Sequence, residues 1–302
     1  MITKYNIIYN LLGLKGIGIV QTNKILMSIK SKINQVTDSE LQNIIADSLE
    51  TTHREEFLNL GNTYLNKTKI IDEVKFLIIT DDVYPSELKS TLSKNSPPIL
   101  SYYGNLNLLN KNKVGFCGSR KASSKGLDVA KDCVEQLVSK DLVIVSGYAA
   151  GVDQETHYTA LKNNGSTIIV LPEGIEFFRI KKELKEIWDW DRVLILSEFF
   201  PNSIWSTGRA MQRNNTIIGL SDVMILIESG ETGGSMEAGK KTLELKKYLF
   251  APIYEGMPES AIGNRILLER GAFPLKKSAK TMKANLSKIF ELINNDAKYR
   301  LL

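Results

Sequence analysis

Cysteine and histidine are scarce in this chain, which has only two of each among its 302 residues. Cys117 ends a short apolar run and Cys133 lies in a helical pattern, and their spacing fits neither a disulfide framework nor a metal site. Two histidines are too few for a histidine metal cluster. We therefore expect no bound metal, two small core cysteines and a reducing compartment.

Long hydrophobic runs are also missing. No apolar stretch approaches the roughly 20 residues of a membrane-spanning helix, and the first residues, MITKYNIIYNLLGLKG, show no signal-peptide cleavage pattern. These absences predict a cytoplasmic protein that does not bind a membrane. The formal net charge of +5 permits a polyanionic partner without demanding one.

Several motifs of catalysis and cofactor binding are absent as well. The chain has no G-x-S-x-G elbow, no H-E-x-x-H and no G-x-G-x-x-G after its first buried strand, so a dinucleotide cofactor is disfavoured. The segment 234–240 comes close to a P-loop, but Lys241 stands where a hydroxyl should bind magnesium. We expect no catalytic residue and no cofactor.

What the chain does have is a series of short apolar runs without polar alternation, separated by helical patterns. Such runs are typical of strands that are buried on both faces of a parallel sheet. They predict an α/β fold, an extended Rossmann-like, doubly wound and mostly parallel sheet. The six runs are 114–117, 142–145, 167–170, 193–196, 223–227 and 248–251.

The first two runs flank a helical pattern and form a βαβ unit, with Gly118-Ser119-Arg120 directly after the first strand. Gly118 lets the backbone approach a ligand, the following helix start favours an anion, and the planar fork of Arg120 suits phosphate. This pattern predicts a phosphate cradle. A tight turn with a solvated arginine fits the triplet about as well.

Polar and glycine-rich turns follow three further strands, and carboxyl ends of parallel strands meet at one edge of a sheet. We therefore expect four chain-distant turns to line one crevice. Asp153, which precedes a helical run and stands four residues before His157, is expected to cap that helix. The four turns are 118–120, Ser146-Gly147, 198–201 and 228–230.

Two segments flank the predicted sheet domain, which we place at residues 72–275, including lead-in strands near 76–79 and 99–103. Residues 1–71 predict a small helical module, in which 11–18 resembles a helix-hairpin-helix turn; a turn without a ligand fits this single hairpin as well. Residues 276–302 predict one amphipathic helix with solvated lysines and no winged-helix domain.

An ordered series of motifs resembles the DNA-processing protein A family (DprA, also called Smf), bacterial recombination mediators that bind single-stranded DNA. Each motif is weak alone, but their order and spacing over most of the chain are specific. The series comprises Tyr84-Pro85, Pro97-Pro98, Gly118-Ser119-Arg120, Ser146-Gly147-Tyr148-Ala149, Gly151-Val152-Asp153, Ser197-Glu198, Arg213-Asn214, Gly234-Ser235, Gly263-Asn264 and Gly271-Ala272.

The resemblance implies a homodimer that binds single-stranded DNA in a basic pocket, protects it and helps load a RecA-type recombinase in recombination or natural transformation, without catalytic turnover. By position, Ser119 and Arg120 would hold a phosphate that Gly118 lets approach, and Arg213 and Asn214 would shape the rim. The remaining residues implied for this site are Ser146, Gly147, Arg179, Lys182, Gly234 and Ser235.

The sequence departs from the family pattern at the predicted pocket. Ala150 stands where a basic residue is usual, Phe178-Arg179 replaces a Tyr-Pro pair, and Asn215 replaces the second arginine of an Arg-Asn-Arg triplet. Aromatic residues in nearby turns, among them Tyr148 and Trp205, would stack bases or pack in the core.

A related Rossmann-like family offers an alternative, in which the ligand is a free nucleotide. Residues 232–237 offer a glycine-rich helix start with one carboxylate, Glu237. The alternative is a nucleotide-binding sensor or a nucleotide phosphoribohydrolase, although Glu237 also suits its own helix dipole.

Overall fold

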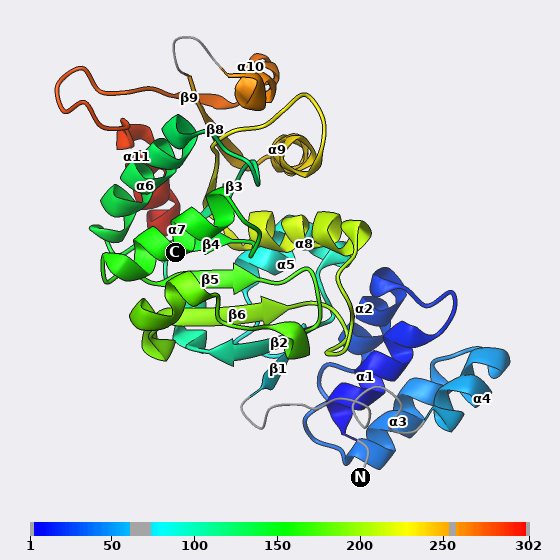
Figure 1. Ribbon diagram of the computed structural model, residues 1–302. Helices are drawn as coiled ribbons and strands as arrows, with labels where there is room; N and C mark the ends of the chain where they lie inside the picture. Colours follow the sequence, from blue (N-terminus) through cyan, green and yellow to red (C-terminus); the bar gives the residue numbers. More distant parts are fainter. Residues whose placement is uncertain (1–2, 61–73, 254–257, 300–302) are drawn as a thin grey trace. The chain divides into compact units, whose positions relative to one another are not determined.

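The protein is seen in a computed structural model that describes residues 3–60, 74–253 and 258–299. The chain forms two compact units (Figure 1): Met1–Tyr103 with Leu171–Phe178 and Leu196–Ser206, and Gly104–Val170 with Arg179–Ile195 and Thr207–Leu302. The strands pair in the order β1-β2-β6-β5-β4-β3-β7-β8-β9. Within the described ranges, every helix is too short or too polar to cross a membrane.

The first unit begins with the helices that the sequence predicts. A turn with Gly16 at φ +89° separates the first two helices, and Gly18 is the N-cap of the second. The turn predicted for a helix-hairpin-helix is therefore present, and DNA binding by it stays a prediction. The helices are α1 (Lys4–Gly13), α2 (Ile19–Ser28), α3 (Asp38–Asp47) and α4 (Thr51–Asn59).

The lead-in strands of the first unit are also confirmed. β1 (Lys75–Ile78) pairs antiparallel with β2 (Ile99–Gly104), and α5 (Ser86–Leu92) lies between them in the chain. The Tyr84 hydroxyl donates a hydrogen bond of 2.8 Å to the Pro97 carbonyl, which fixes the connecting segment. The predicted domain boundary at residue 71 lies outside the described residues.

All six predicted apolar runs form strands; five lie wholly within the second unit, and the sixth, β6, begins there and ends in the first. They are joined through helices, as a doubly wound fold requires. The strands are β3 (Lys113–Cys117), β4 (Val143–Ser146), β5 (Thr167–Val170), β6 (Val193–Ser197), β7 (Val223–Leu226) and β8 (Tyr248–Pro252), followed by β9 (Phe273–Leu275). The helices are α6 (Ser124–Val138), α7 (Val152–Lys162), α8 (Thr207–Leu220), α9 (Gly234–Glu244), α10 (Ile262–Glu269) and α11 (Ser287–Tyr299).

Strand register in the second unit places β3 at the centre of the parallel ladder. Val114 lies opposite Ile144 of β4 and Val223 of β7, and both pairs are parallel. The predicted βαβ unit of β3, α6 and β4 is therefore confirmed. Strand order reverses at β3, because the chain continues to β4 on one side and returns to β7 on the other.

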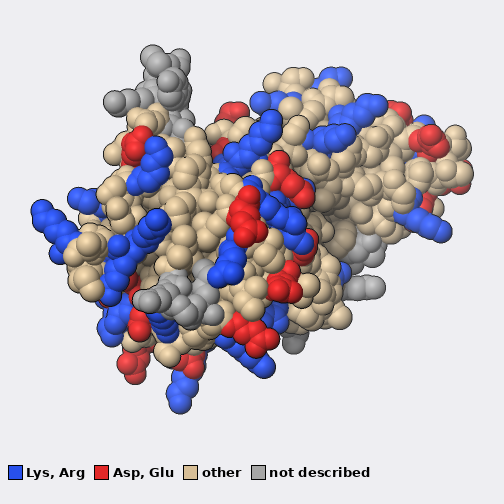
Figure 2. All heavy atoms as spheres, turned by 90° about the horizontal axis from the view of Figure 1, so that it is seen from above, with Lys and Arg blue, Asp and Glu red and all other residues tan. Residues whose placement is uncertain are grey.

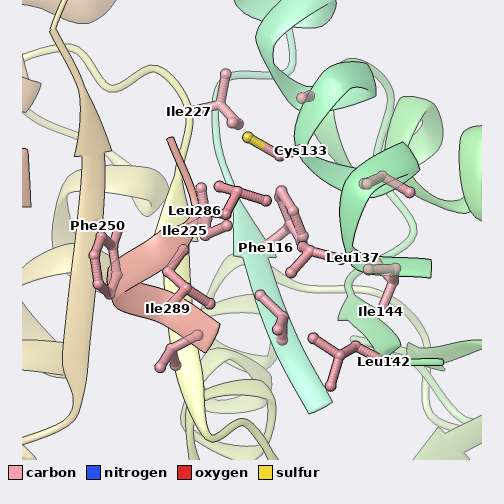
Figure 3. Close-up of a cluster of buried hydrophobic side chains, with 14 of the residues drawn as sticks. Phe116, Cys133, Leu137, Leu142, Ile144, Ile225, Ile227, Phe250, Leu286 and Ile289 are labelled. Carbon is pink, nitrogen blue, oxygen red and sulfur yellow. The ribbon is translucent and has the colours of Figure 1, made fainter. Parts of the chain in front are cut away.

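One face of this sheet is covered by α6, α7 and α11, whose apolar side chains meet those of the strands (Figure 3). Cys133 and Leu137 of α6 lie one turn apart and are fully buried, and Leu286 and Ile289 reach the same cluster beside Phe250. Cys133 is thus the small core residue that the sequence predicts.

The end of the chain corrects two expectations. Pro274 lies within β9, an edge strand where its missing N–H is tolerated, so a strand follows β8 that the apolar runs did not predict. The predicted C-terminal helix begins at Ser287 and not at residue 276. Residues 276–285 instead form a hairpin with a bridge between Lys277 and Ala284.

Leu137→Ala should lower the free energy of unfolding by about 3 kcal/mol, because it leaves a cavity in the cluster between α6 and the sheet. Leu127→Ala, on the same helix but only partly buried, should cost clearly less. Urea unfolding of both variants checks this, and equal losses would contradict the assigned core.

Candidate functional site

The loop after β3 is held by the loop after β4. The Val152 N–H donates a hydrogen bond of 3.3 Å to the Ser119 carbonyl. Gly151 has φ +75°, and a side chain there would collide with the carbonyl oxygens of Ser119 and Arg120. Only glycine permits this approach, so the backbone of residues 119–120 is fixed while the Arg120 side chain is exposed.

The amino end of α6 binds a carboxylate of the protein itself. Glu228, fully buried after β7, accepts hydrogen bonds from the Ser123 N–H at 2.8 Å and from the Ser123 hydroxyl at 2.5 Å. Ser123 also caps the helix by accepting from the Gly126 N–H. A carboxylate of the protein itself therefore lies at the helix start where the sequence predicts a ligand anion. A phosphate near Gly118 would be held by the loop and its arginine.

Asp153 stabilises the preceding loop and does not cap α7, whose N-cap is Gly151. Its carboxylate accepts from the Ala149 N–H at 3.1 Å and lies 2.9 Å from the Ser146 hydroxyl. Ser146 is fully buried at the end of β4. Its hydroxyl therefore helps to fix the loop through Asp153, whereas the sequence predicted that Ser146 contacts a phosphate directly.

Arg213 is buried together with Asp153, in a group of side chains that we call the floor of the site, and not at the rim that the sequence predicts. Its side chain is only 6% exposed, and its Nη1 donates a hydrogen bond of 3.0 Å to the Val170 carbonyl at the end of β5. A side chain at Gly147 would collide with the Arg213 guanidinium and with Asp153. Gly147 is thus required for packing against a buried cation.

His157 fixes the carbonyl of Gly147. Its Nε2 lies 2.6 Å from that oxygen and its Nδ1 lies 2.7 Å from the Thr167 hydroxyl. A carbonyl only accepts, so Nε2 carries the proton. Burial lowers the pKa of His157 to about 4, so the ring is neutral at pH 7. The Thr167 hydroxyl beside Nδ1 also lies 3.0 Å from the Ile144 carbonyl, so its single proton is shared between these two acceptors.

Lys181 is a site residue that the sequence did not single out. Its ammonium lies 4.5 Å from the centroid of the Tyr148 ring and donates to the Ala149 carbonyl at 3.1 Å. The Tyr148 hydroxyl accepts from the Lys181 N–H at 3.0 Å and donates to the Arg179 carbonyl at 3.2 Å. Residues 179–182 are thereby tied to the loop after β4, with the side chains of Arg179 and Lys182 exposed.

Asn214 lies on α8, and Gly234 and Ser235 lie at the start of α9. Asn214 lines a pocket of about 280 Å³ between these helices, together with Glu237 and Lys241. Gly234 begins α9 after the exposed Gly233, which has φ +97° and provides no side-chain cap. Gly234 and Ser235 follow β7, the neighbour of β3 in the sheet, and a role of these three residues in ligand binding stays a prediction.

Glu237, the carboxylate of the alternative hypothesis, forms an ion pair of 2.8 Å with Lys240 one turn later on α9. A phosphoribohydrolase would need this carboxylate against a ribose. The observed pairing is that of an ordinary surface helix, so the geometry does not favour hydrolysis.

The turn after β7 is also structural. The Asn264 side chain of α10 accepts from the Ser229 N–H at 3.0 Å and donates to the Ile227 carbonyl at 2.8 Å. Together with Glu228 on the end of α6, this bond fixes the 228–230 turn. The sequence predicted that four turns line one crevice. Hydrogen bonds join the loop of the 118–120 turn to the loop of the 146–147 turn, and the 228–230 turn supports α6. The 198–201 turn belongs to the other unit.

Comparison with known proteins gives a consistent result. A family model described as DNA recombination-mediator protein A matches residues 75–286. DNA processing protein DprA of Streptococcus pneumoniae is 31% identical over 223 residues, which cover 72% of this chain and 76% of the relative. The Bacillus subtilis protein of the same name is 30% identical over 196 residues, covering 64% and 65%.

Solved structures of similar proteins agree with these matches. The DprA structure from Streptococcus pneumoniae has a TM-score of 0.74 at 28% identity, over 91% of this chain and 95% of that one. DNA processing protein A from Helicobacter pylori, whose structure was solved for its single-stranded DNA binding mode, has a TM-score of 0.60 at 27% identity, over 75% and 96%.

The buried neutral His157 predicts a pH-dependent stability. The unfolded chain binds a proton near the ordinary pKa of about 6.5, whereas the folded chain binds it only near about 4. The unfolded state therefore holds more protons between these values, and the protein loses stability as the pH falls through this window. His157→Gln removes this titration, so its deficit relative to wild type should shrink by about 2 kcal/mol between pH 7 and pH 5.

Chemical unfolding at the two pH values measures this difference. His53→Gln, at a partly exposed position on α4, is the matched control and should keep the wild-type pH dependence. A deficit for His157→Gln that does not change with pH would show that the histidine is not buried as a neutral ring.

Proposed function

This chain belongs to the DNA recombination-mediator protein A family, and from that premise we propose that it binds single-stranded DNA through the loops after β3, β4 and β5. One observation carries the proposal: the exposed Arg120 sits on backbone locked to the loop after β4, and that loop also holds Lys181 against Tyr148. Cations and an aromatic ring beside one another suit a sugar-phosphate chain with its bases.

Each residue has a distinct role in this proposal. Arg120 binds a backbone phosphate with its planar fork, and Gly118 lets the loop after β3 pack closely against Val152, where a side chain would collide. Lys181 supplies a second cation, and Tyr148 offers an aromatic surface next to it. The floor of Asp153, Arg213 and His157 makes no contact with DNA and keeps these loops in place, so the binding geometry exists before DNA arrives.

Lys181 also accounts for one departure from the family pattern. Ala150 is exposed on the loop after β4, where relatives usually carry a basic residue. The Lys181 ammonium donates to the carbonyl of the neighbouring Ala149, which brings a cation to the same loop. Asn215, the other departure, lines the pocket between α8 and α9. Its missing charge therefore matters less to the loops that we propose to bind DNA.

Further properties of the family extend this proposal. They are protection of DNA, loading of a RecA-type recombinase in recombination or natural transformation, a homodimer, a cytoplasmic location and the absence of catalytic turnover. These remain predictions from the family, and we assign no surface of this chain to a recombinase or to a second copy.

Titration of the purified protein with labelled oligo-dT at several salt concentrations tests the proposal. The logarithm of the binding constant should fall by roughly 0.7 per tenfold rise in salt for each phosphate bound. Arg120→Ala and Lys181→Ala should each remove one such contact, which weakens binding about fivefold at 0.1 M salt. Lys140→Ala, in the exposed turn that follows α6, removes the same charge and should bind as wild type.

Incubation with AMP separates this function from the nucleotide alternative. Free adenine should not form under the proposed function. Release of adenine, or equal effects of Arg120→Ala and Lys140→Ala on oligonucleotide binding, would contradict the proposal.

A further inference from the structure

A second groove lies outside the loops that we propose to bind DNA. It has a volume of about 560 Å³ and is bounded by the first half of α6, the ends of β8 and β9, and the hairpin of residues 276–285. Its volume is in the range of ligand sites and exceeds what a single phosphate fills. Its charged residues are Lys125, Asp128, Asp132, Lys276, Lys277 and Lys283.

The hairpin that carries three of these lysines is held in place at both ends. Within it, the Asn285 N–H donates to the Lys276 carbonyl at 2.8 Å. On α6, Asp132 accepts from the Ala284 N–H at 2.5 Å and Gln136 donates to the Ala284 carbonyl at 3.0 Å. Leu286, directly after the hairpin, is buried in the core. The lysines therefore project from a fixed backbone, which lowers the ordering cost of binding.

Charge in the groove is predominantly positive. Four lysines face two aspartates, and Asp132 is already engaged with the hairpin backbone. Figure 2 shows Lys and Arg side chains spread over this face of the molecule, its left side included, with Asp and Glu between them. The excess of lysines in the groove attracts anions.

Surface lysines on nearby helices behave differently. Lys240, Lys241 and Lys288 each form an ion pair with a glutamate three residues away. Over residues 258–299, the ion pairs found involve none of Lys276, Lys277 and Lys283. The hairpin lysines are therefore unlike the solvated, internally paired lysines of an amphipathic helix.

Apolar side chains lie beside these cations. Ile253 at the end of β8 is 44% exposed and Met282 at the tip of the hairpin is 62% exposed, and both line the groove. Lysines beside exposed aliphatic side chains can meet both the phosphates and the apolar faces of the bases of a nucleic acid.

We propose that this groove is a second nucleic-acid contact, in which Lys276, Lys277 and Lys283 bind backbone phosphates and Met282 and Ile253 contact a base. The class of ligand, single-stranded DNA, follows from the proposed function. The location of the contact follows from the residues that line the groove. It assigns a ligand to the hairpin, which none of the predicted site residues reaches.

The double variant Lys276→Ala/Lys283→Ala tests the groove in the full chain, with labelled oligo-dT as the probe. The loss of two phosphate contacts should reduce the slope of the logarithm of the binding constant against the logarithm of the salt concentration by about 1.4. It should weaken binding about 25-fold at 0.1 M salt. Lys131→Ala/Lys280→Ala is the matched control, since it removes the same charge from α6 and from the same hairpin but outside the groove. The control should bind as wild type, and thermal melting should show that both variants are folded.

Lysine acetylation read by mass spectrometry gives an independent readout. Oligo-dT should protect Lys276, Lys277 and Lys283 from acetylation and leave Lys131 and Lys280 reactive. Equal binding by the two double variants, or no protection, would overturn the proposal. Protection by a poly-glutamate peptide but not by oligo-dT would also overturn it, because the groove would then take an acidic peptide.

The same titrations separate this inference from the proposed function. Loss of binding in Arg120→Ala and Lys181→Ala with no loss in Lys276→Ala/Lys283→Ala rejects the groove alone. The reverse pattern keeps the groove and rejects the loops after β3 and β4. A wild-type protein that does not bind oligo-dT rejects both.

Discussion

The close packing of the loop after β4 under the loop after β3 is the constraint on which the site depends. Two glycines make it possible, because side chains at Gly147 and Gly151 would collide with Arg213 and with the Ser119 backbone. Buried polar groups then fix the arrangement: the Asp153 carboxylate accepts from the backbone of the β4 loop, and the His157 ring donates to the Gly147 carbonyl. Buried groups with satisfied hydrogen bonds specify one geometry, since any other would leave them unpaired.

In this arrangement, the groups that hold the loops in place differ from the side chains that we propose to bind the ligand. The amino end of α6, a common place for a ligand phosphate, is neutralised by the protein's own Glu228. Positive charge for a ligand must therefore come from side chains on the loops, and the exposed Arg120 and the half-buried Lys181 provide it.

The sequence predicted the sheet well because strands buried on both faces need no polar alternation, so six apolar runs each became a strand. It missed β9 because Pro274 normally interrupts strands, and only the tertiary structure places it at an edge. It also extended the last helix over the hairpin lysines, since their spacing alone does not show that Asp132 of α6 holds Ala284 in an extended conformation.

The candidate site was predicted less completely, for a physical reason. A sequence reports that position 213 is charged but not that α8 turns the guanidinium into the protein, where it meets the Val170 carbonyl. Similarly, nothing in a row of two lysines distinguishes Lys181, which lies on Tyr148, from the exposed Lys182. Gly118-Ser119-Arg120 was predicted correctly as a loop after β3, and its role as a phosphate contact stays a proposal.

The central claim is that loops after β3, β4 and β5 form one surface for single-stranded DNA. Amide chemical shifts of the full chain during titration with unlabelled oligo-dT test it most directly. The account predicts the largest changes at residues 118–120, 148–151 and 179–182, within one exchange process. Changes confined to the start of α9 at residues 233–235, or to the turn between α1 and α2, would contradict it.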